Sequence, residues 1–116
     1  MNNLLSIHWV LIGAVWHFAN GVLHDIFVVI NHKGKYDREL LRLLMDGHVL
    51  IFSGLVLLFV YLMLLNKIHY AAWISLVIAI SMIVYCGMIF PFLKSFVTLI
   101  LNIILLIVSI KLLLTM

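Results

Sequence analysis

The sequence predicts an all-α integral membrane protein, a four-transmembrane-helix bundle that forms a single domain over residues 1–116. Of the 116 residues, 67% are hydrophobic and 9% are charged, whereas a soluble domain is about 45–50% apolar and about 25% charged. A helix that crosses the hydrocarbon core needs about 20 mainly apolar residues, and the chain has four such runs. Because lipid offers no water to backbone groups, only helices or a closed barrel cross it. Runs of this length favour helices.

The four runs use most of the chain. They cover about 5–30, 47–66, 70–90 and 95–115, and the second can begin as early as residue 36. Short connections near Lys67 and Pro91 separate the last three runs. Pro91 marks the end of the third helix, because a proline pushes the residue before it out of the α region.

The first connection is the longest and most polar. Lys33-Gly34-Lys35 is typical of a turn, and Asp37 and Glu39 suit the first turn of a helix, where the dipole favours acidic side chains. The leucines at positions 40, 41, 43 and 44 make the following segment amphipathic. We expect this segment either to lie at the membrane interface or to extend the second span as one long helix.

Basic residues predict the orientation of the bundle. The first connection holds four of them, whereas the second and third hold one lysine each; the four are Lys33, Lys35, Arg38 and Arg42. The positive-inside rule then predicts a cytoplasmic first loop and N- and C-termini outside, in an inner or plasma membrane. These basic residues lie in loops that set topology, so the expected partner is the lipid bilayer and no nucleic acid.

A row of polar residues follows one side of the first span. At about 100° per residue, five positions fall within an arc of roughly 60°; they are Ser6, Gly13, His17, Asn20 and His24. Ionisable groups inside a membrane are costly, so such a row predicts a functional site. The same row also fits plain hydrogen bonding within the bundle, with Asn20 one turn from both histidines.

Histidines and carboxylates from the first two spans can meet at the cytoplasmic end. His17 and His24 are seven residues apart, about 10.5 Å along a helix, so one metal ion cannot bind both from this helix alone. His48 is the leading partner expected for His24, at a depth shared with Asp25 and Asp46. The two histidines His24 and His48 and the two carboxylates can all face one point only if the second helix breaks at Gly47. We therefore expect a smaller set, such as His24 with His48 or His24 with Asp46.

Small and polar residues also mark helix contacts. In the fourth span Ser95, Thr98, Asn102 and Ser109 share one face, a pattern typical of helix–helix packing or a cavity lining. Gly47 and Gly54, seven residues apart, predict a close-packed seam. Trp16 lies near mid-membrane, where its indole N–H needs a partner.

Three functions remain open at this stage. The first is ion, proton or small-molecule transport, or a channel-like role, as an oligomer with a polar site of His17, Asn20, His24, Asp25, Asp46 and His48. The second is a redox subunit that binds haem b or a divalent metal through His24, His48 and His17. The third is a non-catalytic assembly subunit that packs against a partner membrane subunit. The chain has no motif of a soluble enzyme, so we lean against an enzyme.

Overall fold

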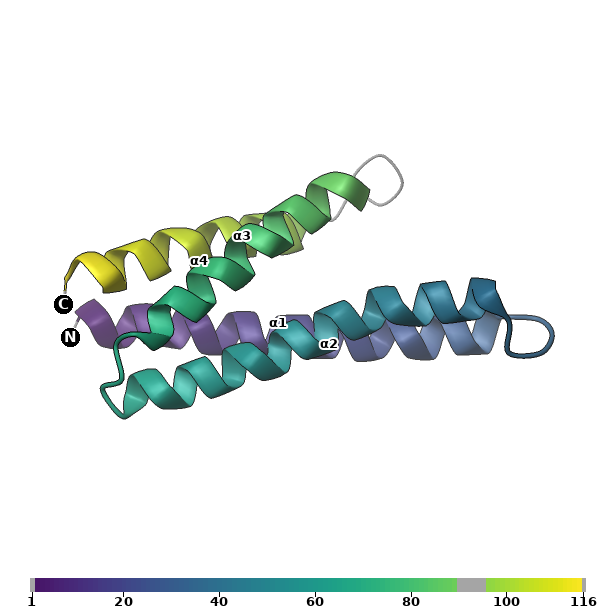
Figure 1. Ribbon diagram of the computed structural model, residues 1–116, viewed down its shortest axis with the longest axis horizontal. Coiled ribbons are helices and arrows are strands. Elements are labelled where there is room, and N and C mark those ends of the chain that lie inside the picture. The colour runs from purple at the N-terminus through teal and green to yellow at the C-terminus, as the bar shows by residue number, and fades with distance from the viewer. Residues whose placement is uncertain (1, 90–95, 116) are drawn as a thin grey trace.

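The chain folds into four helices joined by short connections (Figure 1). A computed structural model describes residues 2–89 and 96–115. The helices are α1 (Asn2–Asn31), α2 (Arg38–Leu65), α3 (Ala71–Ile89) and α4 (Phe96–Leu114), and the described residues contain no strand. Each helix is long and apolar enough to cross a membrane. The predicted all-helical, four-span architecture is therefore confirmed.

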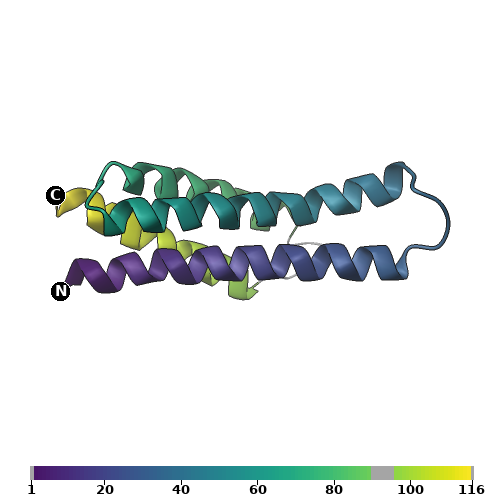
Figure 2. The same ribbon diagram turned by 90° about the horizontal axis from the view of Figure 1, so that it is seen from below.

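The two helical hairpins differ in length. α1 packs against α2 and α4, and α3 packs against α4 and α2. α1 has 30 residues and α2 has 28, whereas α3 and α4 have 19 each. At 1.5 Å per residue these lengths are about 45 Å and about 28 Å. All four helices are level at the end that holds both termini, so the α1–α2 hairpin extends past α3 and α4 at the other end (Figures 1 and 2).

Local signals fix the start of α2. Gly34 adopts a φ of +114° in the turn after α1, a conformation that favours glycine. The Asp37 side chain then accepts a hydrogen bond from the Leu40 backbone N–H at 2.9 Å and caps the helix. The expected turn and helix start are confirmed, and the leucine segment extends the second span as one continuous helix. Pro91 and Ser95, named above, and Lys94, the one lysine of the third connection, lie outside the described residues.

Glycines bring α1 and α2 into close contact. A Cβ atom added to Gly54 would lie 2.6 Å from the Phe18 backbone nitrogen, and one added to Gly21 would lie 2.6 Å from the Gly47 carbonyl oxygen. No side chain fits at such distances, so these positions let the two backbones approach. The predicted seam at Gly47 and Gly54 is confirmed, and Gly21 completes it from α1. Figure 2 shows the two helices side by side along their length.

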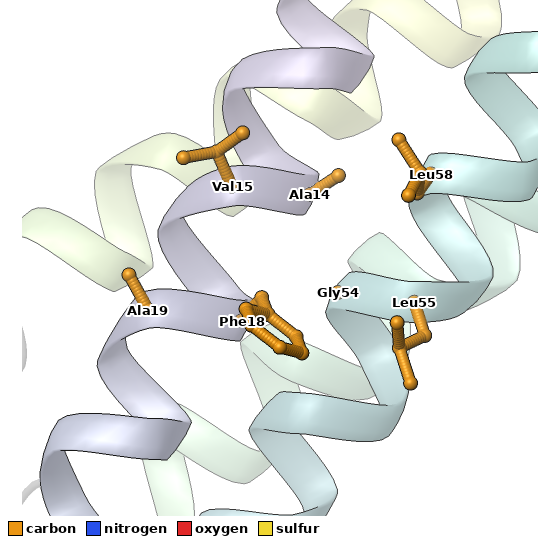
Figure 3. A pocket seen from close by; sticks show the side chains of 7 residues that line it. All are labelled: Ala14, Val15, Phe18, Ala19, Gly54, Leu55 and Leu58. Carbon is orange, nitrogen blue, oxygen red and sulfur yellow. The ribbon is translucent and has the colours of Figure 1, made fainter.

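An apolar groove runs beside this seam on the outer side of the hairpin (Figure 3). α1 contributes Ala14, Val15, Phe18 and Ala19, and α2 contributes Gly54, Leu55 and Leu58. Small residues at its floor and larger ones at its rim create the hollow. We call it the α1–α2 groove.

The apolar core fills the half of the bundle nearest the termini. It joins side chains from all four helices, among them Val10, Leu57, Ala72, Leu105 and Leu112. Each of these five is at most 1% exposed. This half of the bundle is therefore closed by tightly packed aliphatic groups.

The seam predicts a specific cost for a single methyl group. We expect Gly54→Ala to destabilise the protein by about 1–3 kcal/mol, the range for overpacking a tight contact, because the new Cβ would meet α1 backbone atoms. Thermal unfolding in detergent measures this. Gly87→Ala is the matched control, since no atom of the described residues lies within 4 Å of a Cβ at that helical position. Equal stability of the two variants would contradict the seam.

Candidate functional site

A layer of polar side chains joins α1 to α4 near the middle of the bundle. His17, 0% exposed, places Nε2 3.0 Å from Asn102 Oδ1. Asn102, also 0% exposed, donates from Nδ2 to the Thr98 carbonyl oxygen at 2.8 Å. Trp16 Nε1 donates to Thr98 Oγ1 at 2.9 Å, and Asn20 Nδ2 donates to the same oxygen at 3.4 Å. We call these five residues the α1–α4 polar layer.

The hydrogen bonds of Asn102 fix the tautomer of His17. Because Nδ2 of Asn102 donates to a carbonyl, its Oδ1 is the atom that faces the histidine and must accept. His17 therefore carries its proton on Nε2 in the neutral state. Its Nδ1 is buried and bonds to no group in the described part of the chain. The ring thus presents a nitrogen that can accept a hydrogen bond inside the bundle.

The layer joins two stripes that the sequence shows separately. His17 and Asn20 belong to the polar row predicted in the first span, and Thr98 and Asn102 belong to the stripe predicted in the fourth. The indole N–H of Trp16, which was expected to need a partner, donates a hydrogen bond to Thr98. The stripe of the fourth span fitted either helix packing or a cavity lining, and it did not identify Asn102 as the partner of His17, because helical periodicity does not tell which helix faces which.

A second feature links α1 to α2 towards the first loop. His48 Nδ1 lies 3.1 Å from Asp25 Oδ2 and 3.2 Å from the Leu44 carbonyl oxygen. The Asp25 side chain is 15% exposed, whereas that of His48 is 73% exposed. The other carboxylate oxygen, Oδ1, is buried and has no partner among the described residues. It packs against Gly47, where a Cβ would collide with it. We call Asp25 and His48 the carboxylate–imidazole pair.

The expected pairing of His24 is wrong. His24 Nε2 bonds to the Leu43 carbonyl oxygen at 3.0 Å, and His48 bonds to Asp25 instead. α2 runs unbroken through Gly47, so Asp46 points elsewhere. It is exposed. Neither His48 nor Asp46 is therefore the partner of His24.

The histidines do not gather into a metal site. No group of three or more His, Cys, Asp or Glu side chains within residues 2–89 and 96–115 is placed to hold a metal ion. His17 bonds through Nε2 to the Asn102 side chain of α4. His24 bonds through Nε2 to the Leu43 carbonyl oxygen of α2. The predicted ligand set of His24, His48 and His17 is thus spread over three environments, and this geometry does not support the haem or metal alternative.

Fold and site together define a polytopic membrane protein that carries protonatable side chains within its helical hairpin. The comparisons with family models, curated proteins and solved structures find no match to this chain.

The His17–Asn102 bond can be tested by a double-mutant cycle. We expect His17→Leu and Asn102→Leu to be non-additive, with a coupling of about 0.6 kcal/mol and at most about 1.7 kcal/mol, as for other hydrogen bonds between membrane helices. Unfolding of the two single variants and the double variant in the same detergent gives this energy.

The control cycle combines Asn102→Leu with His8→Leu. His8 is exposed and lies towards the N-terminus of α1, so those effects should add to within about 0.5 kcal/mol. Additivity in the His17 cycle as well would contradict a stabilising bond.

Proposed function

We propose that this protein moves protons across its membrane, alone or coupled to another solute, with His17 as the intramembrane proton acceptor. The observation that supports the proposal is the Nδ1 lone pair of His17, a residue that is 0% exposed, which has no hydrogen-bond partner among the described residues. A buried polar atom without a partner is costly. Ionisable groups inside membranes are typical of proton relays, and a neutral imidazole that donates at one nitrogen can accept at the other.

The carboxylate–imidazole pair is the proposed entry to this site. Asp25 is eight residues from His17, about 12 Å along α1. Asn20 lies between them and turns its amide to Thr98. His48 is mostly exposed and bonds to Asp25, so it can exchange protons with the solvent side and pass them to the carboxylate.

Passage towards the termini requires a change in the bundle. Beyond His17 lie the packed side chains Val10, Leu57 and Leu105, each at most 1% exposed. This half also holds the buried, hydrogen-bonded pair Ser75 and Ser109, but its core is otherwise mainly aliphatic. We propose that the protein works as a homo-oligomer or with a partner membrane subunit, whose contacts open the second half of the path.

The proposed orientation follows from the basic first loop. Lys33, Lys35, Arg38 and Arg42 favour the cytoplasm for that loop. Both termini then face outward, in an inner or plasma membrane. Proton entry at the carboxylate–imidazole pair is on the cytoplasmic side in this orientation.

Proton flux in liposomes tests the function. We expect His17→Gln to lower the flux roughly 10²-fold, the usual scale for loss of a proton-transfer group, because glutamine can still bond to Asn102 but cannot carry the proton. A pH-sensitive dye inside vesicles driven by a potassium diffusion potential measures the rate. We expect Asp25→Asn to lower it as well.

His8→Gln is the matched control, since it makes the same chemical change at an exposed position outside the layer. Its flux should equal that of the wild type. Wild-type vesicles that leak no faster than empty ones, or a His17→Gln rate equal to the control, would overturn the proposal.

A further inference from the structure

We infer that the outer side of the α1–α2 hairpin binds a phospholipid with a primary ammonium headgroup, with the headgroup at the carboxylate–imidazole pair and one acyl chain in the α1–α2 groove. This site goes beyond the proposed proton transfer, although both use Asp25. It would give the hairpin a preference for one class of membrane lipid.

The groove and the pair lie in line on the same side of the hairpin. Phe18 of the groove and Asp25 of the pair are seven residues apart on α1, and Leu55 and His48 are seven residues apart on α2. Seven residues turn a helix through about 700°, so each couple shares one face. Their axial separation is about 10.5 Å. An elongated amphiphile that lies along the hairpin can therefore reach both.

The groove suits a single aliphatic chain. All its lining residues are apolar, and its volume is about 220 Å³, below the about 300–1,000 Å³ of sites for compact drug-sized ligands. Figure 3 shows Ala14 and Gly54 at its floor between Phe18, Leu55 and Leu58. The three larger side chains are each about 40% exposed, so the bilayer side of the groove is open to lipid.

The pair supplies the charge that selects the headgroup. A neutral His48 donates from Nδ1 to Asp25 or to the Leu44 carbonyl, which leaves Nε2 as an acceptor on a ring that is 73% exposed. With Asp25 ionised the pair carries one negative charge. A primary ammonium can donate N–H groups to the imidazole and to the accessible edge of the carboxylate, and such charge-assisted bonds are strong. A quaternary ammonium carries the same charge but has no N–H to donate.

The depth of the carboxylate–imidazole pair in the membrane also fits a lipid headgroup. Ser53 of α2 bonds to Met82 of α3, seven residues before α3 ends at Ile89. His48 is five residues before Ser53 on the antiparallel α2, about 7.5 Å farther towards that end of α3. Because α3 is about 28 Å long and the hydrocarbon core about 30 Å thick, this end is where lipid headgroups begin. The groove then lies at the depth of the acyl chains.

Lipid retention tests the site. The wild type is reconstituted in nanodiscs that contain equal amounts of phosphatidylethanolamine and phosphatidylcholine and is then released into mild detergent. Native mass spectrometry counts the lipids that remain bound. We expect a roughly tenfold preference for phosphatidylethanolamine, equivalent to about 1.4 kcal/mol. Asp25→Asn and His48→Phe should reduce the preference to the bulk ratio.

Ala19→Leu should lower retention of both lipids, because the larger side chain fills the groove at an exposed position. Val77→Leu, on the exposed side of α3, is the matched control and should change nothing. A bulk lipid ratio in the wild type, or equal retention by Ala19→Leu and Val77→Leu, would overturn the lipid site. These two results remain decisive if Asp25→Asn does not fold.

Flux measured in vesicles of phosphatidylcholine alone separates the two proposals. Flux that depends on His17 there, without lipid selectivity in the nanodiscs, leaves proton transfer standing and removes the lipid site. Lipid selectivity without proton flux leaves the lipid site standing and removes proton transfer.

Discussion

The close approach of α1 and α2 is the constraint on which the rest of the structure depends. Gly21, Gly47 and Gly54 let the two backbones meet where any Cβ would collide with the other helix. Dispersion contacts and hydrogen bonds, rather than hydrophobic burial, hold helices together in lipid, so this proximity is a main source of stability. The seam also sets the position of Asp25, whose carboxylate packs against Gly47 beside His48. The α1–α2 groove arises on the same hairpin, where small residues leave its outer side hollow.

The polar groups of the proposed proton path lie in two environments with different chemistry. In the α1–α4 polar layer the side chains bond to one another, whereas Nδ1 of His17, an acceptor in the tautomer that Asn102 sets, has no donor among the described residues. That single lone pair supports the proposed proton transfer. The carboxylate–imidazole pair is half open to its surroundings, which suits exchange with solvent or with a headgroup. The sealed aliphatic core beyond His17 explains why we propose a conformational change or a second subunit for complete passage.

Single-helix patterns predicted much of this arrangement. The spans, the start of the second helix at Asp37, the seam at Gly47 and Gly54 and the inward direction of His17 all follow from composition and helical periodicity. The pairing across helices did not follow. His24 was expected to face His48 or Asp46, but it bonds to the Leu43 backbone while His48 turns to Asp25. A rotation of one helix by a fraction of a turn exchanges such partners, and no local signal fixes that rotation.

The sequence by itself determined that this is a membrane bundle of four helices and which side of the first and fourth helices is polar. Those properties depend on how each residue interacts with lipid and on the 3.6-residue repeat, both of which act within one helix. Only the tertiary structure decided that Asn102 bonds to His17, that Asp25 bonds to His48 and that the candidate haem or metal ligands His17, His24 and His48 lie in separate environments. Those choices depend on the rotation and separation of neighbouring helices. Packing at the glycine seam sets both for α1 and α2, and the pattern of a single span does not contain them.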